Sequence, residues 1–360
     1  MNPALMVRFR PTGPWRIGPD SGARNRVDRI YHSDSLFSAV THAMARLGRL
    51  EEWLVATVAN PQGAAVRFSS CFPYLEDVLF VVPPRNLWPP PPSPKVRWTN
   101  ARFVPLAVVA ALANEQPLKD NGWRLDGSSE CLVQGNAPSR GGPFRPALRS
   151  HAGVDRTTGS AVALHDTACL EFAEGGGLWA VAAFADLEAE SLWKEDVRAA
   201  LRLLADAGLG GERSIGWGRS ADPEFSEGIL PDMILPPKPP APPVEAPEGV
   251  EVAPKPPVVE TGYWLLSMFS PAAGDAVDWQ RGFYSIVSRG GRIESPARSG
   301  EAKKLLRMVV EGSVLVAEAP PRGAAPNVAP GGFPHPVFRA GFALAIPVPL
   351  RQIERPVGAA

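Results

Sequence analysis

The sequence predicts an α+β fold made of two compact units joined by a proline-rich linker. Three observations support this. The 360 residues suffice for two domains. Strand-type and helix-type patterns alternate over residues 1–235. Ten prolines fall in 236–257, a segment too poor in apolar side chains to build a core, so we predict an extended linker there.

The first unit, residues 1–235, has the predicted order β-α-β-β-insertion-β-β-α-β. Leu5, Val7 and Phe9 alternate as in a strand. A first helix starts at an N-cap, Ser33 or Asp34, and stops at Gly48. A second helix has one apolar face and ends at Gly208. The other strands are predicted at 66–70, 78–82, 168–172 and 178–184.

The segment 83–148 opens with seven prolines in 83–94 and has weak periodicity. We therefore expect it to be an insertion in the first unit that the core does not need. The second unit, 258–360, is predicted to consist mostly of strands, at 263–269, 282–288, 305–310, 313–316 and 342–348.

The cysteines and the hydropathy pattern indicate a cytoplasmic protein. Cys71, Cys131 and Cys169 are far apart and odd in number, which is typical of buried thiols in a reducing compartment. There is no leader-type N-terminus, and no apolar stretch approaches the roughly 20 residues of a membrane span, so no membrane partner is expected.

The basic residues favour a nucleic-acid partner through their type and position. Lys+Arg and Asp+Glu balance at 37 each, yet only seven of the basic residues are Lys. Arginine suits phosphate and base-edge contacts. Six Arg fall in 8–29 and seven basic residues in 281–307, against two acidic residues in each segment. A high-GC genome would explain the Arg excess but not this clustering.

A glycine-rich loop, residues 208–219, is the strongest candidate binding element. Its glycines permit positive φ and let backbone N–H groups approach a phosphate. The loop lacks the Gly-Lys-Ser/Thr of a phosphate-binding P-loop and the spacing of a dinucleotide fingerprint. The alternative is a flexible turn that ends a helix. The candidate residues are Gly210, Gly211, Arg213, Ser214, Gly216, Gly218 and Arg219.

Three other segments have features of phosphate sites. His32 and Ser33 open the first helix, whose N–H groups and dipole attract anions. A basic loop at 149–159 contains Arg149 and Arg156; alone it would be a solvated loop with an Asp155–Arg156 pair. A second basic segment at 284–292 contains the run Ser288, Arg289 and Gly290.

The sequence contains no recognisable catalytic set. The five histidines have no cysteine or carboxylate partner at metal-ligand spacing, and neither a nucleophile elbow nor an HExxH motif occurs. We therefore expect no enzymatic activity, no metal and no cofactor.

In order along the chain, these segments resemble the RAMP superfamily of CRISPR-associated proteins, specifically the fourth subunit of type III-A (Csm) effector complexes. The resemblance covers most of the chain. Six segments carry it: His32-Ser-Asp-Ser-Leu-Phe, Phe72-Pro-Tyr, Val154-Asp-Arg-Thr-Thr-Gly, the loop 208–219, Tyr284-Ser-Ile-Val-Ser-Arg-Gly-Gly and Gly332-Phe-Pro-His-Pro-Val-Phe-Arg.

The resemblance implies two ferredoxin-like (RRM-like) domains, with 83–148 as a thumb-type hairpin inserted in the first. It implies binding of the repeat-derived 5′ handle of a guide CRISPR RNA, and contact with target RNA near the handle junction. The implied protein partners are the large polymerase/nuclease subunit and an adjacent backbone RAMP subunit. By position, His32, Ser33, Arg149, Arg156, Gly210–Arg219 and Ser288–Gly290 would line the RNA path.

Two alternatives stay open at this point. One is a metal-independent endonuclease of the same superfamily that cuts repeat RNA, with His32 and a nearby Tyr or Lys as its acid–base pair. The other is a scaffold subunit that contacts only protein.

Overall fold

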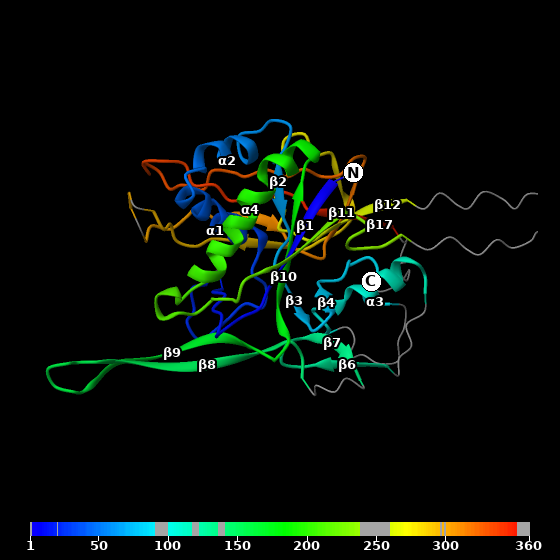
Figure 1. The fold of residues 1–360 in the computed structure, drawn as a ribbon. Helices are drawn as coiled ribbons and strands as arrows, with labels where there is room; N and C mark the ends of the chain where they lie inside the picture. Colours follow the sequence, from blue (N-terminus) through cyan, green and yellow to red (C-terminus); the bar gives the residue numbers. More distant parts are fainter. Residues whose placement is uncertain are drawn as a thin grey trace, which may run out of the picture.

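The computed structural model (Figure 1) describes residues 2–19, 21–90, 100–116, 122–135, 141–237, 260–295, 297–298 and 300–350. The predicted linker lies outside the described residues, apart from Pro236 and Pro237. No helix within the described ranges combines the length and apolar character of a membrane span.

A seven-stranded antiparallel sheet organises the first unit. Its order is β11-β1-β10-β3-β4-β5, and β2 also pairs with β10. Every residue of β10 is buried, which explains its continuous apolar sequence. The strands are β1 (Asn2–Phe9), β2 (Val66–Phe68), β3 (Phe72–Leu75), β4 (Val78–Val81), β5 (Val104–Pro105), β10 (Gly176–Phe184) and β11 (Glu224–Leu230).

Three helices gather on one side of this sheet (Figure 1): α1 (Ser33–Arg46), α2 (Leu50–Thr57) and α4 (Leu187–Ala207). The apolar stripes predicted for α1 and α4 are buried. The rings of Phe37 and Trp53 lie 5.6 Å apart, and those of Trp53 and Trp193 lie 5.4 Å apart, so aromatic packing joins the three helices. Helix α2 was not predicted, because it buries only Trp53 and Thr57 and has almost no apolar stripe.

The segment 83–148 was predicted to be an insertion that the core does not need. In the structure, much of it belongs to the core. It contains β5, α3 (Leu106–Ala113), β6 (Trp123–Asp126) and β7 (Cys131–Gln134). Phe103, Val109 and Leu112 are buried in the same apolar cluster as β1 and β10. Helix α3 reads Leu-Ala-Val-Val-Ala-Ala-Leu-Ala, apolar all round, so it gives no amphipathic signal. This is why periodicity alone left the segment unassigned.

A long two-stranded hairpin, β8 (Phe144–Val154) and β9 (Ala161–Phe172), projects from the body of the molecule (Figure 1). Its base is buried at Phe144 and Leu170, whereas Leu148 and Leu164 farther out are 59% and 74% exposed. The projecting hairpin therefore lies almost entirely beyond the predicted limits 83–148 and overlaps them only in its first few residues.

The second unit forms strands, as predicted, in a sheet of order β13-β16-β12-β17 and a separate pair β14-β15. The described part of 260–350 contains no helix. It therefore lacks the helices of the second ferredoxin-like domain that the resemblance implied. Its connections are proline-containing loops, held for example by Asp275, which accepts the N–H groups of Arg322 and Gly323. The strands are β12 (Thr261–Leu265), β13 (Val277–Phe283), β14 (Ile286–Arg289), β15 (Leu306–Val309), β16 (Val314–Ala317) and β17 (Ala345–Pro349).

The two units share one apolar core. Trp264 and Phe342 of the second unit belong to the main cluster of the first, and the Phe342 ring meets Phe37 of α1 at 5.5 Å. The Trp264 indole N–H donates to the carbonyl of Val82 at 3.1 Å. The two sheets therefore pack against each other through a shared apolar core.

A pair of leucine substitutions tests whether the expected insertion belongs to the core. Leu112→Ala should lower the free energy of unfolding by about 2–5 kcal/mol, because Leu112 is 4% exposed. The matched change Leu164→Ala, at a 74% exposed position, should cost less than about 0.5 kcal/mol. Denaturant unfolding measures both, and equal effects would contradict the assignment of α3 to the core.

Candidate nucleic-acid interface

The start of α1 lies in a buried ionic network. His32 contacts Glu311 of the second unit through Nδ1 at 2.8 Å and Asp28 through Nε2 at 3.2 Å. Burial alone would lower the pKa of His32, but the charge of Glu311 and the hydrogen bonds to Asp28 and Glu311 raise it to about 10. Burial would conversely raise the pKa of Glu311, and the charge of His32 holds it below its usual range. His32 is therefore an imidazolium held between two carboxylates.

Asp34 forms the second half of this network. Its carboxylate accepts Arg289 Nη2 at 3.0 Å and is also paired with Arg339, and all three side chains are buried. Burial would raise the pKa of Asp34, but the two guanidinium groups lower it to about 2. Ser33 Oγ accepts the backbone N–H of Met268 at 2.9 Å. The network joins the helix start to β14 and to the loops of the second unit.

Three predicted RNA contacts have internal partners instead. His32, Ser33 and Arg289 are 8%, 5% and 6% exposed, and each is held by the network. The sequence identified this motif but gave no sign of Glu311, some 280 residues away. Ser288 is exposed and Gly290 is partly exposed, so the backbone around Arg289 stays at the surface.

The glycine-rich loop is a packed turn whose glycines serve close backbone contacts. A Cβ on Gly210 would lie 2.2 Å from the carbonyl oxygen of Arg16, and one on Gly218 would lie 2.0 Å from that of Leu209. Both glycines have positive φ, as do Gly208 and Gly216. Only glycine fits where the loop crosses the segment 11–16.

Several N–H groups predicted to bind phosphate are already used inside the protein. Gly211 donates to Arg16 at 2.8 Å, Gly216 to Arg213 at 3.0 Å and Gly218 to Pro14 at 2.9 Å. The predicted backbone cradle is therefore reduced to the turn that the loop presents outward. That turn is η3 (Arg213–Ile215), whose three residues are exposed, and Arg219 is exposed beside it.

Arg213 connects the loop to the second unit. Its guanidinium donates to both carboxylate oxygens of Glu294 at 3.1 Å, and both side chains are substantially exposed. An exposed pair of this kind contributes little to stability. It positions Arg213 while leaving the guanidinium open to an anion that displaces or joins Glu294.

The hairpin contributes a second set of arginines. Arg145 and Arg149 lie on one face of β8 and share Glu171 of β9. Burial would raise the pKa of Glu171, but hydrogen bonds from the two arginines lower it. The Arg149 side chain is 54% exposed. Arg156 is exposed in the turn at the hairpin tip, separated along β8 from Arg149.

An aromatic stack brings the hairpin and the glycine-rich loop together. The rings of His151 and His165 stack at 5.5 Å across the two strands, and His151 meets Trp217 of the loop at 5.4 Å. His151 Nε2 is buried and has no hydrogen-bond partner among the described residues. The stack places the face of β8 that carries Arg149 next to the loop that carries Arg213 and Arg219.

Arg16 holds the hairpin base and the glycine-rich loop together, and it was not singled out in the sequence analysis. Its guanidinium donates to the carbonyls of Arg24 and Ala168 at 2.9 Å, and its backbone pairs with Gly211. It thereby ties the hairpin base to the loop. The clustering of six arginines in 8–29 was the available signal. Nothing in one sequence separates buried Arg16 from exposed Arg24 and Arg26.

The corner thus formed carries several exposed arginines, and two of them, Arg149 and Arg213, are paired with Glu171 and Glu294. Around the glycine-rich loop, the exposed arginines are Arg24, Arg149, Arg213 and Arg219. Ser214 of the loop is exposed between Arg213 and Arg219. Flexible guanidinium groups on a rigid, packed backbone suit the sugar–phosphate chain of a single-stranded nucleic acid.

Comparison with known protein families finds a match over the second unit. Residues 260–348 match the family model described as CRISPR Csm4 C-terminal domain. No curated protein matches the chain. The match falls on the second unit, which supplies Glu311, Arg289 and Arg339 to the buried network.

Solved structures resemble the whole chain. One belongs to the Csm3–Csm4 subcomplex in the type III-A CRISPR-Cas interference complex, with a TM-score of 0.58 and 16% identity, covering 98% of this chain and 100% of that one. Another belongs to a Csm1–Csm4 cassette in complex with cA4, with a TM-score of 0.55, 16% identity and coverage of 97% and 99%. At this identity the likeness establishes the fold, a mixed α+β arrangement of antiparallel sheets.

The ionic network predicts a defined pH dependence of stability. The pKa of His32 is about 10 in the folded protein and about 6.5 in an unfolded chain, so its protonation stabilises the fold fully below pH 6.5. This stabilisation is lost as the pH rises through 10. The difference in free energy of unfolding between the native protein and His32→Gln should therefore shrink from pH 6.5 to 10. A difference that stays constant over this range would contradict the imidazolium assignment.

The glycine contacts predict graded effects within one loop. Gly210→Ala and Gly218→Ala should each cost about 2–4 kcal/mol, because a Cβ would overlap a backbone oxygen at positive φ. Gly216→Ala should cost only about 1 kcal/mol, because its Cβ would meet nothing within 4 Å. Thermal unfolding measures all three, and equal losses would show that φ alone requires glycine here.

Proposed function

We propose that this chain, whose residues 260–348 match the Csm4 C-terminal domain model, holds the 5′ handle of a guide RNA in a type III-A CRISPR effector complex. The observation that carries this proposal is the corner of Arg149, Arg213 and Arg219 around the glycine-rich loop. The corner presents cations on a rigid backbone, which suits phosphates more than a protein surface.

The topology of the first unit supports an RRM-like reading of its sheet. The order β11-β1-β10-β3, with α1 and α4 on one side, is that of a ferredoxin-like βαββαβ unit. Under this proposal RNA follows the edge formed by the loop between α4 and β11. The second unit, which has no helix in its described part, fixes α1 through the ionic network.

We assign the thumb-type role to β8–β9 in place of 83–148. The hairpin projects from the body (Figure 1) and exposes Leu148 and Leu164, which a core element would bury. His151, part of the way along β8, meets Trp217 of the glycine-rich loop, so the hairpin passes beside the arginine corner. A guide held at the corner would meet the hairpin next, where target RNA pairs beside the handle.

The protein partners follow from the same proposal. The matching solved structures are named as Csm1–Csm4 and Csm3–Csm4 assemblies. We propose that this chain likewise contacts a large polymerase/nuclease subunit and a backbone RAMP subunit, and that the complex is cytoplasmic.

We propose a binding role without catalysis, and the state of His32 favours it over the endonuclease alternative. A general base must be unprotonated and reach its substrate. His32 is 8% exposed, charged near neutral pH and held by two carboxylates. The purified protein should leave labelled repeat RNA uncut in the presence of chelator. Handle-sized products would favour the nuclease.

The test of RNA binding uses matched arginine variants in the assembled complex. Arg149→Ala and Arg213→Ala should each weaken guide RNA binding by about 1–3 kcal/mol if the lost contact is charge-assisted. For a single strand, each lost phosphate contact should make the slope of log K against log salt shallower by about 0.7. Guide occupancy and its salt dependence report both effects.

Arg281→Ala is the matched control for these variants. Arg281 pairs with Glu260 on the second unit, and its side chain is 48% exposed, close to the 43% of Arg213. The control should retain full guide occupancy. An equal loss in Arg281→Ala, or no loss in Arg149→Ala and Arg213→Ala, would remove the corner as the RNA site.

A further inference from the structure

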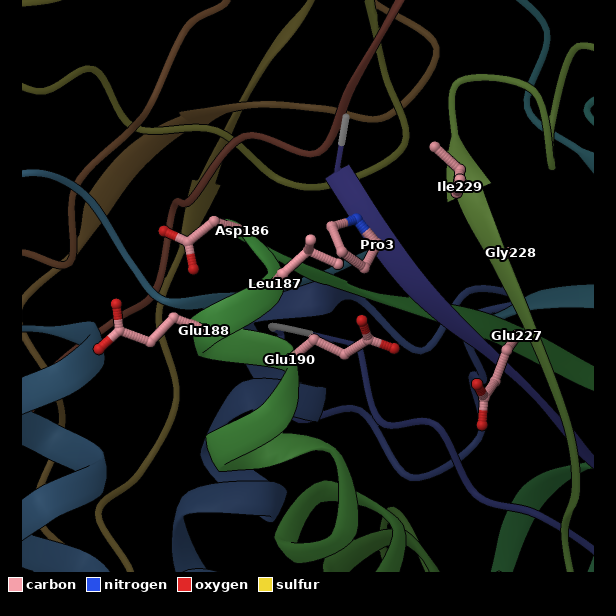
Figure 2. Close-up of a pocket in the computed structure, with 8 residues that line it drawn as sticks. All are labelled: Pro3, Asp186, Leu187, Glu188, Glu190, Glu227, Gly228 and Ile229. Atoms are coloured by element: carbon pink, nitrogen blue, oxygen red, sulfur yellow. The ribbon is translucent and has the colours of Figure 1, made fainter.

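A groove lies between the first turn of α4 and strand β11, apart from the arginine corner. It has a volume of about 760 Å³ and is lined by Pro3, Asp186, Leu187, Glu188, Glu190, Glu227, Gly228 and Ile229. Figure 2 shows Leu187 beside Pro3, with Glu190 and Glu227 on either side of β1. Leu187 is 73% exposed and Ile229 is 43% exposed, so apolar surface remains open to solvent.

Strand β11 is the edge of the large sheet. Within the described ranges it pairs only with β1. The carbonyl of Ile229 accepts the N–H of Met233 in the turn that follows, so it points away from β1. Because backbone direction alternates along an antiparallel strand, the N–H and C=O groups of Phe225 and Glu227 point the same way. An unpaired edge of this kind is a template for another strand.

The charge around the groove is negative. Four carboxylates line it, and no basic residue does. Two described cations pair with these carboxylates: Lys194 bridges Glu190 and Glu227 at 3.2 Å, and Arg198 pairs with Glu227 as well as with Glu195 outside the groove. Two cations against four lining carboxylates leave the groove acidic.

We propose that this groove and the edge of β11 dock an extended, basic segment of a partner protein, which adds a strand to the sheet. Main-chain hydrogen bonds to β11 would supply affinity. Lys or Arg side chains would meet the carboxylates, and an apolar side chain between them would cover Leu187 and Ile229. The proposal goes beyond RNA binding and stands without it.

The charge selects this occupant over two others. A nucleic acid would bring phosphates against four carboxylates and be repelled. A second copy of this chain, pairing β11 with β11, would bring Glu224 and Glu227 of one copy against the acidic groove of the other. A basic strand neutralises the groove.

The experiment selects peptides of about ten residues from a display library on the full chain, and then discards those that also bind Leu187→Arg. This variant changes an exposed residue, so folding should be unaffected, while it removes the apolar contact and adds a repelling charge. The matched control is Leu192→Arg, at a 57% exposed leucine of the same helix outside the groove.

The expected peptides alternate Lys or Arg with apolar residues, bind Leu192→Arg like the native chain, and bind Leu187→Arg at least roughly tenfold more weakly. N-methylation of alternate peptide amides should weaken binding by roughly tenfold or more, because it blocks strand pairing. Peptides that tolerate N-methylation, acidic or unpatterned peptides, or no peptide that distinguishes the two variants would each overturn the proposal. A self-association that Leu187→Arg abolishes would replace it with a dimer interface.

Discussion

The position of the second unit on the first depends on the buried ionic network at the start of α1. Asp34 meets Arg289 and Arg339, and His32 meets Glu311, all in the interior. A buried charge left without its partner costs several kcal/mol, so the two units cannot separate without exposing or stranding these groups. The ionic network therefore holds the second unit in one defined position on the first. Apolar contacts alone, such as Phe37 against Phe342, would tolerate sliding.

The arginine corner follows from that position. Arg213 reaches Glu294 only because the second unit is held beside the glycine-rich loop. Trp217 of the same loop packs against His151 of β8, so the loop also fixes the direction of the hairpin. The buried contacts thus fix the position of the backbone, whereas the exposed guanidinium groups can adapt to a ligand. This division between a rigid frame and flexible cations suits an RNA that must be held firmly at one end and paired at the other.

Sequence patterns predicted what depends on local periodicity. The strand β1 and the apolar stripes of α1 and α4 were predicted correctly. Strand β1 is buried along nearly its whole length, and each helix buries one face. Helix α3 was not predicted because it is apolar all round. The described residues of the second unit form strands without the implied helices. His32 and Ser33 were predicted as RNA contacts, whereas the structure pairs them with Glu311 and Met268, which lie far along the chain. A single sequence can show that a residue belongs to a motif, but it does not reveal which residue far along the chain will contact it.

The most direct test is photo-crosslinking of a guide RNA that carries 4-thiouridine in its 5′ handle, within the assembled complex, with the attached residues identified by mass spectrometry. We predict crosslinks in this chain at β8 around Arg149 and at the turn from Arg213 to Arg219. Crosslinks that instead fall on the acidic groove, or on the strand around Arg281, would contradict this prediction.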